Sequence, residues 1–94
     1  MSDIEIGTET ESPTHWQYQV RVFADGRTHQ YQVMLSFQDY DLWSRGRVPP
    51  SRVVHAAMRF LLARESAEQI MPRFDCAVIR RYFPEVDREL GELL

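Results

Sequence analysis

The stretch Trp16–Phe37, WQYQVRVFADGRTHQYQVMLSF, decides the fold of this 94-residue chain. Its first half places apolar residues at even numbers, its second half places them at odd numbers, and Asp25-Gly26 lies between the two. Alternation with a period of two is typical of strands that are buried on one face, and Asp-Gly is a frequent turn of two-residue hairpins. The sequence therefore predicts an antiparallel β-hairpin with strands at about residues 16–24 and 28–37.

The register of this hairpin also follows from the alternation. A connection of two or four residues centred on Asp25-Gly26 places the apolar residues of the two strands opposite one another. A three-residue connection would place each apolar residue opposite a polar one, because a shift by one residue turns every side chain to the other face. We therefore expect Val20 to pair with Tyr31 and Tyr18 to pair with Val33.

Beyond the hairpin the apolar spacing becomes helical. A short turn after Phe37, capped by Asp39 and ended by Gly46, precedes Pro49-Pro50. Proline is tolerated in the first turn of a helix, where its missing N–H is not needed. The spacing of apolar residues then predicts one long helix at about residues 50–64.

Two or three short helices are expected after the long one. Ser66-x-x-Gln69 has the spacing of a capping box, and Asp75 is placed to cap a helix over residues 76–83. The last residues are helical in spacing but short, and we expect their end to be frayed. The sequence thus predicts one small α+β domain over residues 15–94, with its elements in the order β-β-α-α.

The start of the chain has a different composition. Residues 1–14 carry four acids and no basic residue, so a flexible acidic tail is predicted there. An acidic start is the reverse of a secretory or mitochondrial leader, and no stretch is apolar enough to span a membrane. A single cysteine, Cys76, fits a reducing cytoplasm, which is where we expect the protein to reside.

Apolar residues cover roughly 200 degrees of the circumference of the long helix, about twice what a surface helix needs. The helix should therefore be covered on two sides, by the hairpin and by either the later helix or a second copy of the chain. An isolated hairpin also leaves both of its edges unpaired. We therefore expect a homodimer, formed through a hairpin edge or through this wide apolar helix face.

A basic segment without acids runs from Leu42 to Arg64. Every basic residue of the chain is an arginine, which a GC-rich bacterial genome explains, and the absence of lysine excludes a lysine Schiff base. Arginine and aromatic residues dominate the hot spots of protein contacts, so this segment is a candidate contact surface. The competing interpretation is that the arginines form a solvated face without a partner. The predicted surface for binding a protein partner consists of Trp43, Arg45, Arg47, Arg52, His55 and Arg59.

A DNA-binding transcriptional regulator is the alternative. It would use the basic helix stripe or the outward hairpin face, whose polar side chains can read base edges: Gln17, Gln19, Arg21, Thr28, Gln30 and Gln32. Ribbon-helix-helix repressors use a strand ribbon in this way, but they contribute one strand per chain where two are predicted here. A formal charge of −3 is also unlike that of most nucleic-acid binders, so nucleic acid is the less favoured partner.

No catalytic, metal-binding or cofactor-binding group is predicted. The histidines and Cys76 lack the spacing of metal ligands, and the scattered glycines form no phosphate loop. Cys76 stands at a predicted helix start, yet the carboxylate of Asp75 opposes thiolate formation and no activating base can be placed. We therefore expect a module that binds without catalysis and needs no cofactor.

The last third of the chain carries a further pattern. The letters FLLARE at residues 60–65, Ile70, FD at 74–75 and VIRRYFPE at 78–85 resemble a pattern of short bacterial proteins. The resemblance implies a bacterial origin and a self-contained small domain, and no activity or ligand is attached to it.

Overall fold

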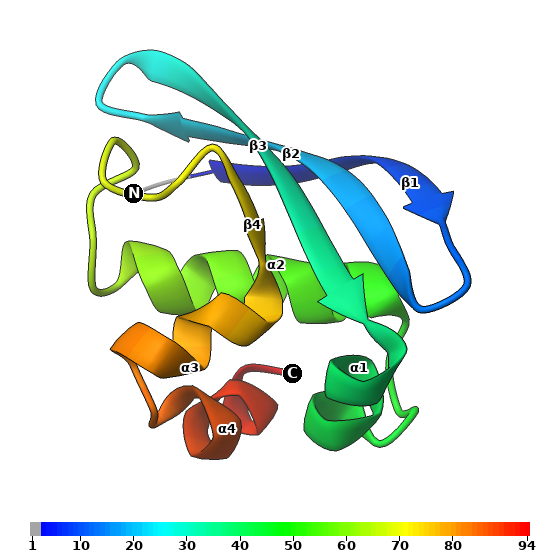
Figure 1. The fold of residues 1–94 in the computed structure, drawn as a ribbon. Helices are drawn as coiled ribbons and strands as arrows, with labels where there is room; N and C mark the ends of the chain where they lie inside the picture. Colours follow the sequence, from blue (N-terminus) through cyan, green and yellow to red (C-terminus); the bar gives the residue numbers. More distant parts are fainter. Residues whose placement is uncertain (1–2) are drawn as a thin grey trace.

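The structure, a computed structural model, describes residues 3–94. A four-stranded sheet in the order β1-β2-β3-β4 forms one layer, and the helices lie together on one side of it (Figure 1). The strands are β1 (Asp3–Glu11), β2 (His15–Ala24), β3 (Arg27–Ser36) and β4 (Arg73–Asp75). The helices are α1 (Phe37–Ser44), α2 (Pro50–Leu62), α3 (Ile79–Tyr82) and α4 (Val86–Glu89), with 3-10 turns η1 (Cys76–Val78) and η2 (Leu90–Leu93). The predicted α+β class is confirmed, and the structure adds two strands to the expected pair.

Strands β2 and β3 form the predicted hairpin. Val20 pairs with Tyr31 and Tyr18 with Val33, so the predicted register is confirmed. Asp25 and Gly26 adopt φ values of 54° and 74°, and two consecutive positive φ values are what a type I′ hairpin turn requires. The inward residues of both strands are buried, because alternation gives one whole face of a strand to the core.

The prediction of a flexible acidic tail over residues 1–14 is corrected by strand β1, which pairs antiparallel with β2. Ile4 and Ile6 alternate with acids in β1 and pack against the hydrophobic core. The acids that pointed to a tail find partners on β2, since Glu5 pairs with Arg21 and Glu9 accepts a hydrogen bond from the Tyr18 hydroxyl. Residues 1 and 2 of the predicted tail lie outside the described residues.

Strand β4 pairs in parallel with β3 and places Phe74 beside Val33. Three residues are too few to show a periodicity, so only the Asp75 cap was predicted at this point. Strand β1 pairs along the β2 edge of the hairpin, whereas β4 pairs only with Gln32–Met34 of the β3 edge. One of the two hairpin edges that favoured a homodimer is therefore covered, and the other is covered in part.

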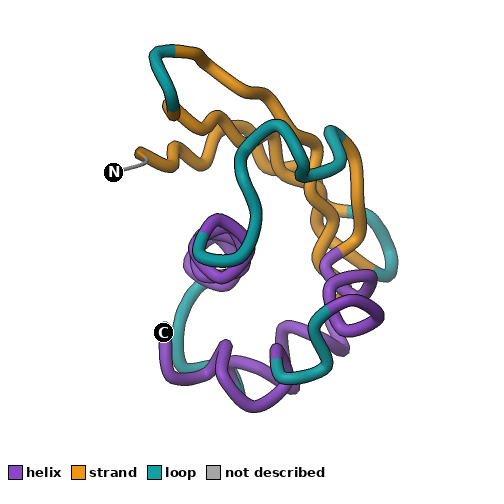
Figure 2. Tube along the Cα trace, turned by 90° about the vertical axis from the view of Figure 1, so that its left-hand side faces the viewer, coloured by secondary structure: helices purple, strands orange, loops and turns teal. Residues whose placement is uncertain are grey.

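Helix α2 spans Pro50–Leu62 where residues 50–64 were predicted, and Pro50 lies in its first turn. Figure 2 shows this helix end-on, between the sheet and the helices that end the chain. Its buried residues are Val53, Val54, Ala56, Ala57, Met58, Phe60 and Leu61. One chain thus supplies both covers for the wide apolar face.

The helix caps agree with the sequence in part. Asp75 caps η1, as predicted, by accepting a hydrogen bond from the Ala77 N–H at 2.9 Å, but the helix expected over residues 76–83 is divided into η1 and α3. Helix α1 is capped by the Ser36 hydroxyl, which accepts from the Asp39 N–H at 3.0 Å, so the prediction of Asp39 as the cap is wrong. Asp39 faces inward instead and pairs with Arg80 at 2.8 Å.

Candidate functional site

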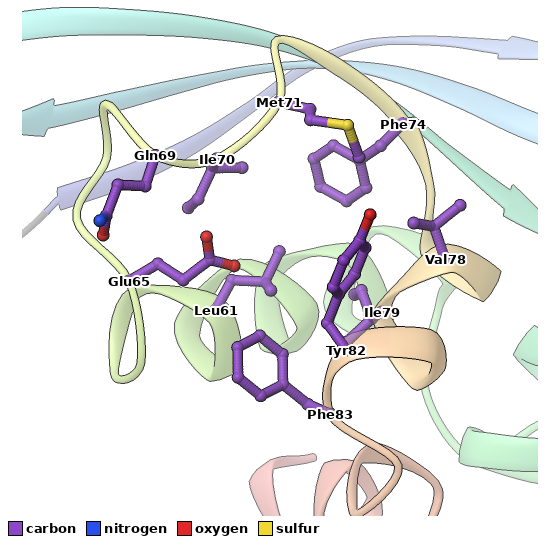
Figure 3. Close-up of a pocket in the computed structure, with 10 residues that line it drawn as sticks. All are labelled: Leu61, Glu65, Gln69, Ile70, Met71, Phe74, Val78, Ile79, Tyr82 and Phe83. Carbon is purple, nitrogen blue, oxygen red and sulfur yellow. The ribbon is translucent and has the colours of Figure 1, made fainter.

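An apolar groove of about 300 Å³ lies between the end of α2, the loop of residues 63–72 and the η1–α3 segment (Figure 3). Its lining residues are Leu61, Glu65, Gln69, Ile70, Met71, Phe74, Val78, Ile79, Tyr82 and Phe83. Leu61, Ile70, Phe74 and Ile79 are buried, so the groove has a wall that belongs to the hydrophobic core. Such a wall is pre-formed and does not have to be ordered by a ligand.

The loop that forms one side of the groove is fixed by hydrogen bonds. The Ser66 N–H donates to the Gln69 side-chain oxygen at 2.9 Å, which is one half of the predicted capping box, although a turn and no helix follows. The Tyr31 hydroxyl donates to the Ala67 carbonyl at 2.5 Å, and Arg27 pairs with Glu68 at 3.1 Å. These bonds hold the loop against β3 and the hairpin tip, and thereby hold the groove open.

Two large apolar side chains at the groove are exposed. Tyr82 is 69% exposed and Met71 is 46% exposed. Tyr82 belongs to the segment predicted as a helix over residues 76–83, but α3 is only four residues long and leaves the Tyr82 ring in solvent. Exposed aromatic and methionine side chains beside a concave apolar surface are typical of contact sites in proteins.

The charged residues near the groove differ in how they are paired. Arg64 binds Glu89 at 3.1 Å and Glu85 at 3.5 Å, and its guanidinium lies 3.6 Å from the centre of the Phe60 ring. Within residues 3–94, no hydrogen bond or ion pair engages the carboxylate of Glu65, which is half-buried on the groove wall. Glu65 is thus the charged group of this site that is left for a ligand.

Trp43, one of the predicted contact residues, is buried with 5% of its surface exposed. Its indole N–H donates to the Asp87 carboxylate at 2.8 Å, and the Arg80 guanidinium lies 5.4 Å from its ring centre. The prediction of Trp43 as a contact residue is therefore corrected, because the side chain joins α1 to the C-terminal helices.

The five other predicted contact residues do not gather on one surface. Arg45 and Arg47 line a hollow beside the α1–α2 connection, whereas Arg52 and His55 line a different hollow against β1. Arg59 is exposed on α2 and lines neither of them. Burial, and then the charges of Arg59 and Arg52, lower the pKa of His55, so its imidazole is neutral at pH 7.

The outward face of the hairpin is open, but the hairpin stands in the middle of the sheet. Strand β1 flanks it along β2, and β4 flanks it at Gln32–Met34 of β3, each at about 4.8 Å, so the ribbon that would enter a DNA major groove of roughly 12 Å is wider than the expected two strands. Arg21 on this face is paired with Glu5. The geometry therefore gives the DNA-binding alternative no support from the hairpin.

Cys76 and its charged neighbours form a structural cluster. Burial is complete and, together with the nearby carboxylate of Asp75, raises the pKa of the Cys76 thiol far above its ordinary value, so the group stays protonated. Arg80 joins Asp39 at 2.8 Å and Asp87 at 3.0 Å. Within residues 3–94 no three potential ligands are placed to hold a metal ion, and no helix is long and apolar enough to cross a membrane.

The groove could not be predicted from a motif, although all of its lining residues lie within residues 61–83. They fall on the end of α2, a loop, β4 and the η1–α3 segment, and their irregular spacing has no single period. One local signal existed: Ile70-Met71-Pro72 places two apolar residues in a loop, where polar residues are usual. Comparisons with protein-family models, with curated proteins and with solved structures gave no match.

Proposed function

We propose that this chain is a binding module that recognises a protein partner at the apolar groove and acts without catalysis. The observation that carries the proposal is the exposure of Tyr82 and Met71 at a groove whose wall belongs to the core. Aromatic residues and methionine are enriched in the contact surfaces of proteins, and a central apolar pocket is where partner side chains anchor.

The size and chemistry of the groove favour a protein side chain over a free small molecule. A volume of about 300 Å³ is at the lower end of small-molecule sites, and few polar groups line it to orient such a molecule. A leucine, isoleucine or phenylalanine anchor of a partner fits that volume. The remaining contact area would then come from the partner surface around the anchor.

A bacterial cytoplasm is the setting that we propose for this interaction. The chain has one cysteine, which is fully buried with a raised pKa, and its fold therefore needs no oxidising compartment.

The proposal is tested by titrating the isotope-labelled protein with N-acetyl-Leu-Ala-Gln amide and following backbone and Met71 methyl resonances by NMR. We expect saturable shifts at the groove with a Kd of the order of 1 mM, since about a dozen contacting atoms at about 0.3 kcal/mol each give about 4 kcal/mol. Tyr82→Ala should weaken binding about fivefold by removing roughly 1 kcal/mol of contact.

Leu42→Ala is the matched control, because Leu42 is 55% exposed and lies on α1, outside the groove. This variant should bind the peptide as the unaltered protein does. Shifts that do not saturate, or that Leu42→Ala reduces as much as Tyr82→Ala does, would show that the groove is not the binding site.

A further inference from the structure

We infer that the groove binds a basic side chain of its protein partner, an arginine or lysine, next to the apolar anchor. This inference rests on the proposed function and adds the chemistry of the partner. It is carried by the position of Glu65 between an apolar wall and aromatic rings.

Glu65 follows the end of α2, and Figure 3 shows its carboxylate directed across Leu61 into the groove. The side chain is half-buried, and no group within residues 3–94 donates a hydrogen bond to it or pairs with it. A carboxylate that loses part of its hydration beside apolar groups costs free energy unless a donor compensates it. A cation from the partner would supply that compensation.

The neighbouring charges cannot take this role within the chain. Arg64 is held by Glu85 and Glu89 and by the Phe60 carbonyl, to which it donates at 3.1 Å. Glu68, the other acid of the loop, is already paired with Arg27. The loop therefore has one carboxylate paired within the chain, facing the hairpin tip, and one without a partner in residues 3–94, facing the groove and partly open to water.

Aromatic rings strengthen the preference for a cation. Phe74, Tyr82 and Phe83 all line the groove that Glu65 enters. The faces of aromatic rings attract guanidinium and ammonium groups, and the apolar stem of an arginine or lysine packs on the same surface. An arginine over aromatic rings already occurs in this protein, at Arg64 and Phe60.

A second copy of the chain is the competing occupant. The most exposed large apolar side chains outside the groove are Phe23 and Leu42. Asp3 lies opposite Phe23 in the sheet, so docking through Phe23 would bring a carboxylate towards Glu65, which costs free energy through like-charge repulsion. Leu42 shares a hollow with Arg45 and Arg47, so docking of an identical chain through Leu42 is the outcome that sedimentation velocity tests.

The test uses three blocked peptides, N-acetyl-Leu-Ala-Arg amide and its counterparts ending in glutamine and glutamate. The leucine and the third residue lie on one side of an extended peptide, so both can face the groove. We expect the arginine peptide to bind about threefold more tightly than the glutamine peptide and the glutamate peptide to bind most weakly, as for a partly exposed ion pair.

Glu65→Gln should remove this order while the leucine still binds. The matched variant Glu92→Gln, at an exposed glutamate outside the groove, should preserve it. Equal binding of the three peptides to the unaltered protein, or an arginine preference that survives Glu65→Gln, would overturn the inference and leave the groove as a binding site. Failure of the glutamine peptide to bind would instead overturn the proposed function. A dimer in sedimentation velocity that Tyr82→Ala dissociates would identify a second copy as the occupant and overturn the inference as well.

Discussion

At the scale of single residues, Arg80 does most to join distant parts of the chain. Its guanidinium binds Asp39 of α1 and Asp87 of α4 and lies over the Trp43 ring. The sequence predicted Asp39 as a helix cap, because aspartate is common at helix starts. It predicted Trp43 as part of a contact surface, because tryptophan near arginines is common in such surfaces. Forty-one residues separate Asp39 from Arg80, and no local pattern reports a pairing over that distance.

Asp39→Ala is predicted to lower the free energy of unfolding by about 2 kcal/mol. This is less than the roughly 3–5 kcal/mol for a fully buried pair, because Arg80 is partly exposed and keeps Asp87 as a partner. Urea denaturation followed by tryptophan fluorescence measures the change. Asp41→Ala, an exposed aspartate in the same helix, should change it by less than about 0.5 kcal/mol, and an equal loss in both variants would contradict the role of the buried pair.

Asp87 is predicted to make stability depend on pH in the acid range. The hydrogen bond from Arg80, and then that from Trp43, lower its pKa below the ordinary value of 3.8. The folded state therefore holds the proton less tightly than the unfolded state, so the stabilisation is complete above pH 3.8 and is lost as the pH falls through the folded pKa. Unfolding curves of the unaltered protein and Asp87→Asn should differ most near pH 6 and converge at low pH. A difference that is constant with pH would exclude this linkage.

At the scale of elements, helices and strands were predicted correctly where their contacting residues are close in the sequence, and were missed where they are far apart or where charged residues hide the pattern. Helix α2 and the Asp75 cap depend on neighbours a few residues away, and the β2–β3 hairpin depends on a tight turn and a regular alternation in two adjacent strands. The sequence predicted all three. Strand β1 was missed because its acids hid the alternation of Ile4 and Ile6. Strand β4 was missed because it is three residues long and its partner is 41 residues earlier in the chain. The groove was missed because its lining residues, within 61–83, lie on several short elements and follow no single period.

The hairpin turn gives a prediction at this scale. Gly26 has a φ of 74°, and an alanine there adopts the left-handed region at a cost of about 1–2 kcal/mol. Gly26→Ala should therefore reduce the free energy of unfolding by about that amount in denaturant titrations. Gly91→Ala is the control, because Gly91 lies in η2 without a positive φ and a Cβ there would meet its nearest neighbour at an ordinary 3.7 Å. A loss at Gly91 as large as that at Gly26 would show that φ is not the cause.

At the scale of the whole molecule, the chain closes surfaces that the sequence left for a second copy. Strand β1 covers the β2 edge of the hairpin and β4 covers Gln32–Met34 of the β3 edge, while the sheet and the C-terminal helices cover the two sides of α2, as Figure 2 shows. One outer edge of the sheet is β1, whose acidic side chains oppose pairing with an identical strand. The wide apolar face of α2 is thus covered within one chain, and it no longer requires a second copy.

Removal of residues 1–11 is predicted to convert the protein into a self-associating form. The deletion exposes the edge of β2, which is ten residues long, and uncovers the part of the core that Ile4 and Ile6 cover. An exposed strand edge pairs readily with the same strand of another copy. Sedimentation velocity should show a concentration-dependent rise in mass for the shortened chain and none for the full chain, with circular dichroism confirming that the hairpin is still folded. Because the deletion also removes acids from a chain of charge −3, the control is the full chain with three exposed acids outside the sheet neutralised, by Asp25→Asn, Asp41→Asn and Glu92→Gln, which leaves every β1 contact unchanged. Association of that control to the same extent would assign the effect to charge and not to the uncovered edge.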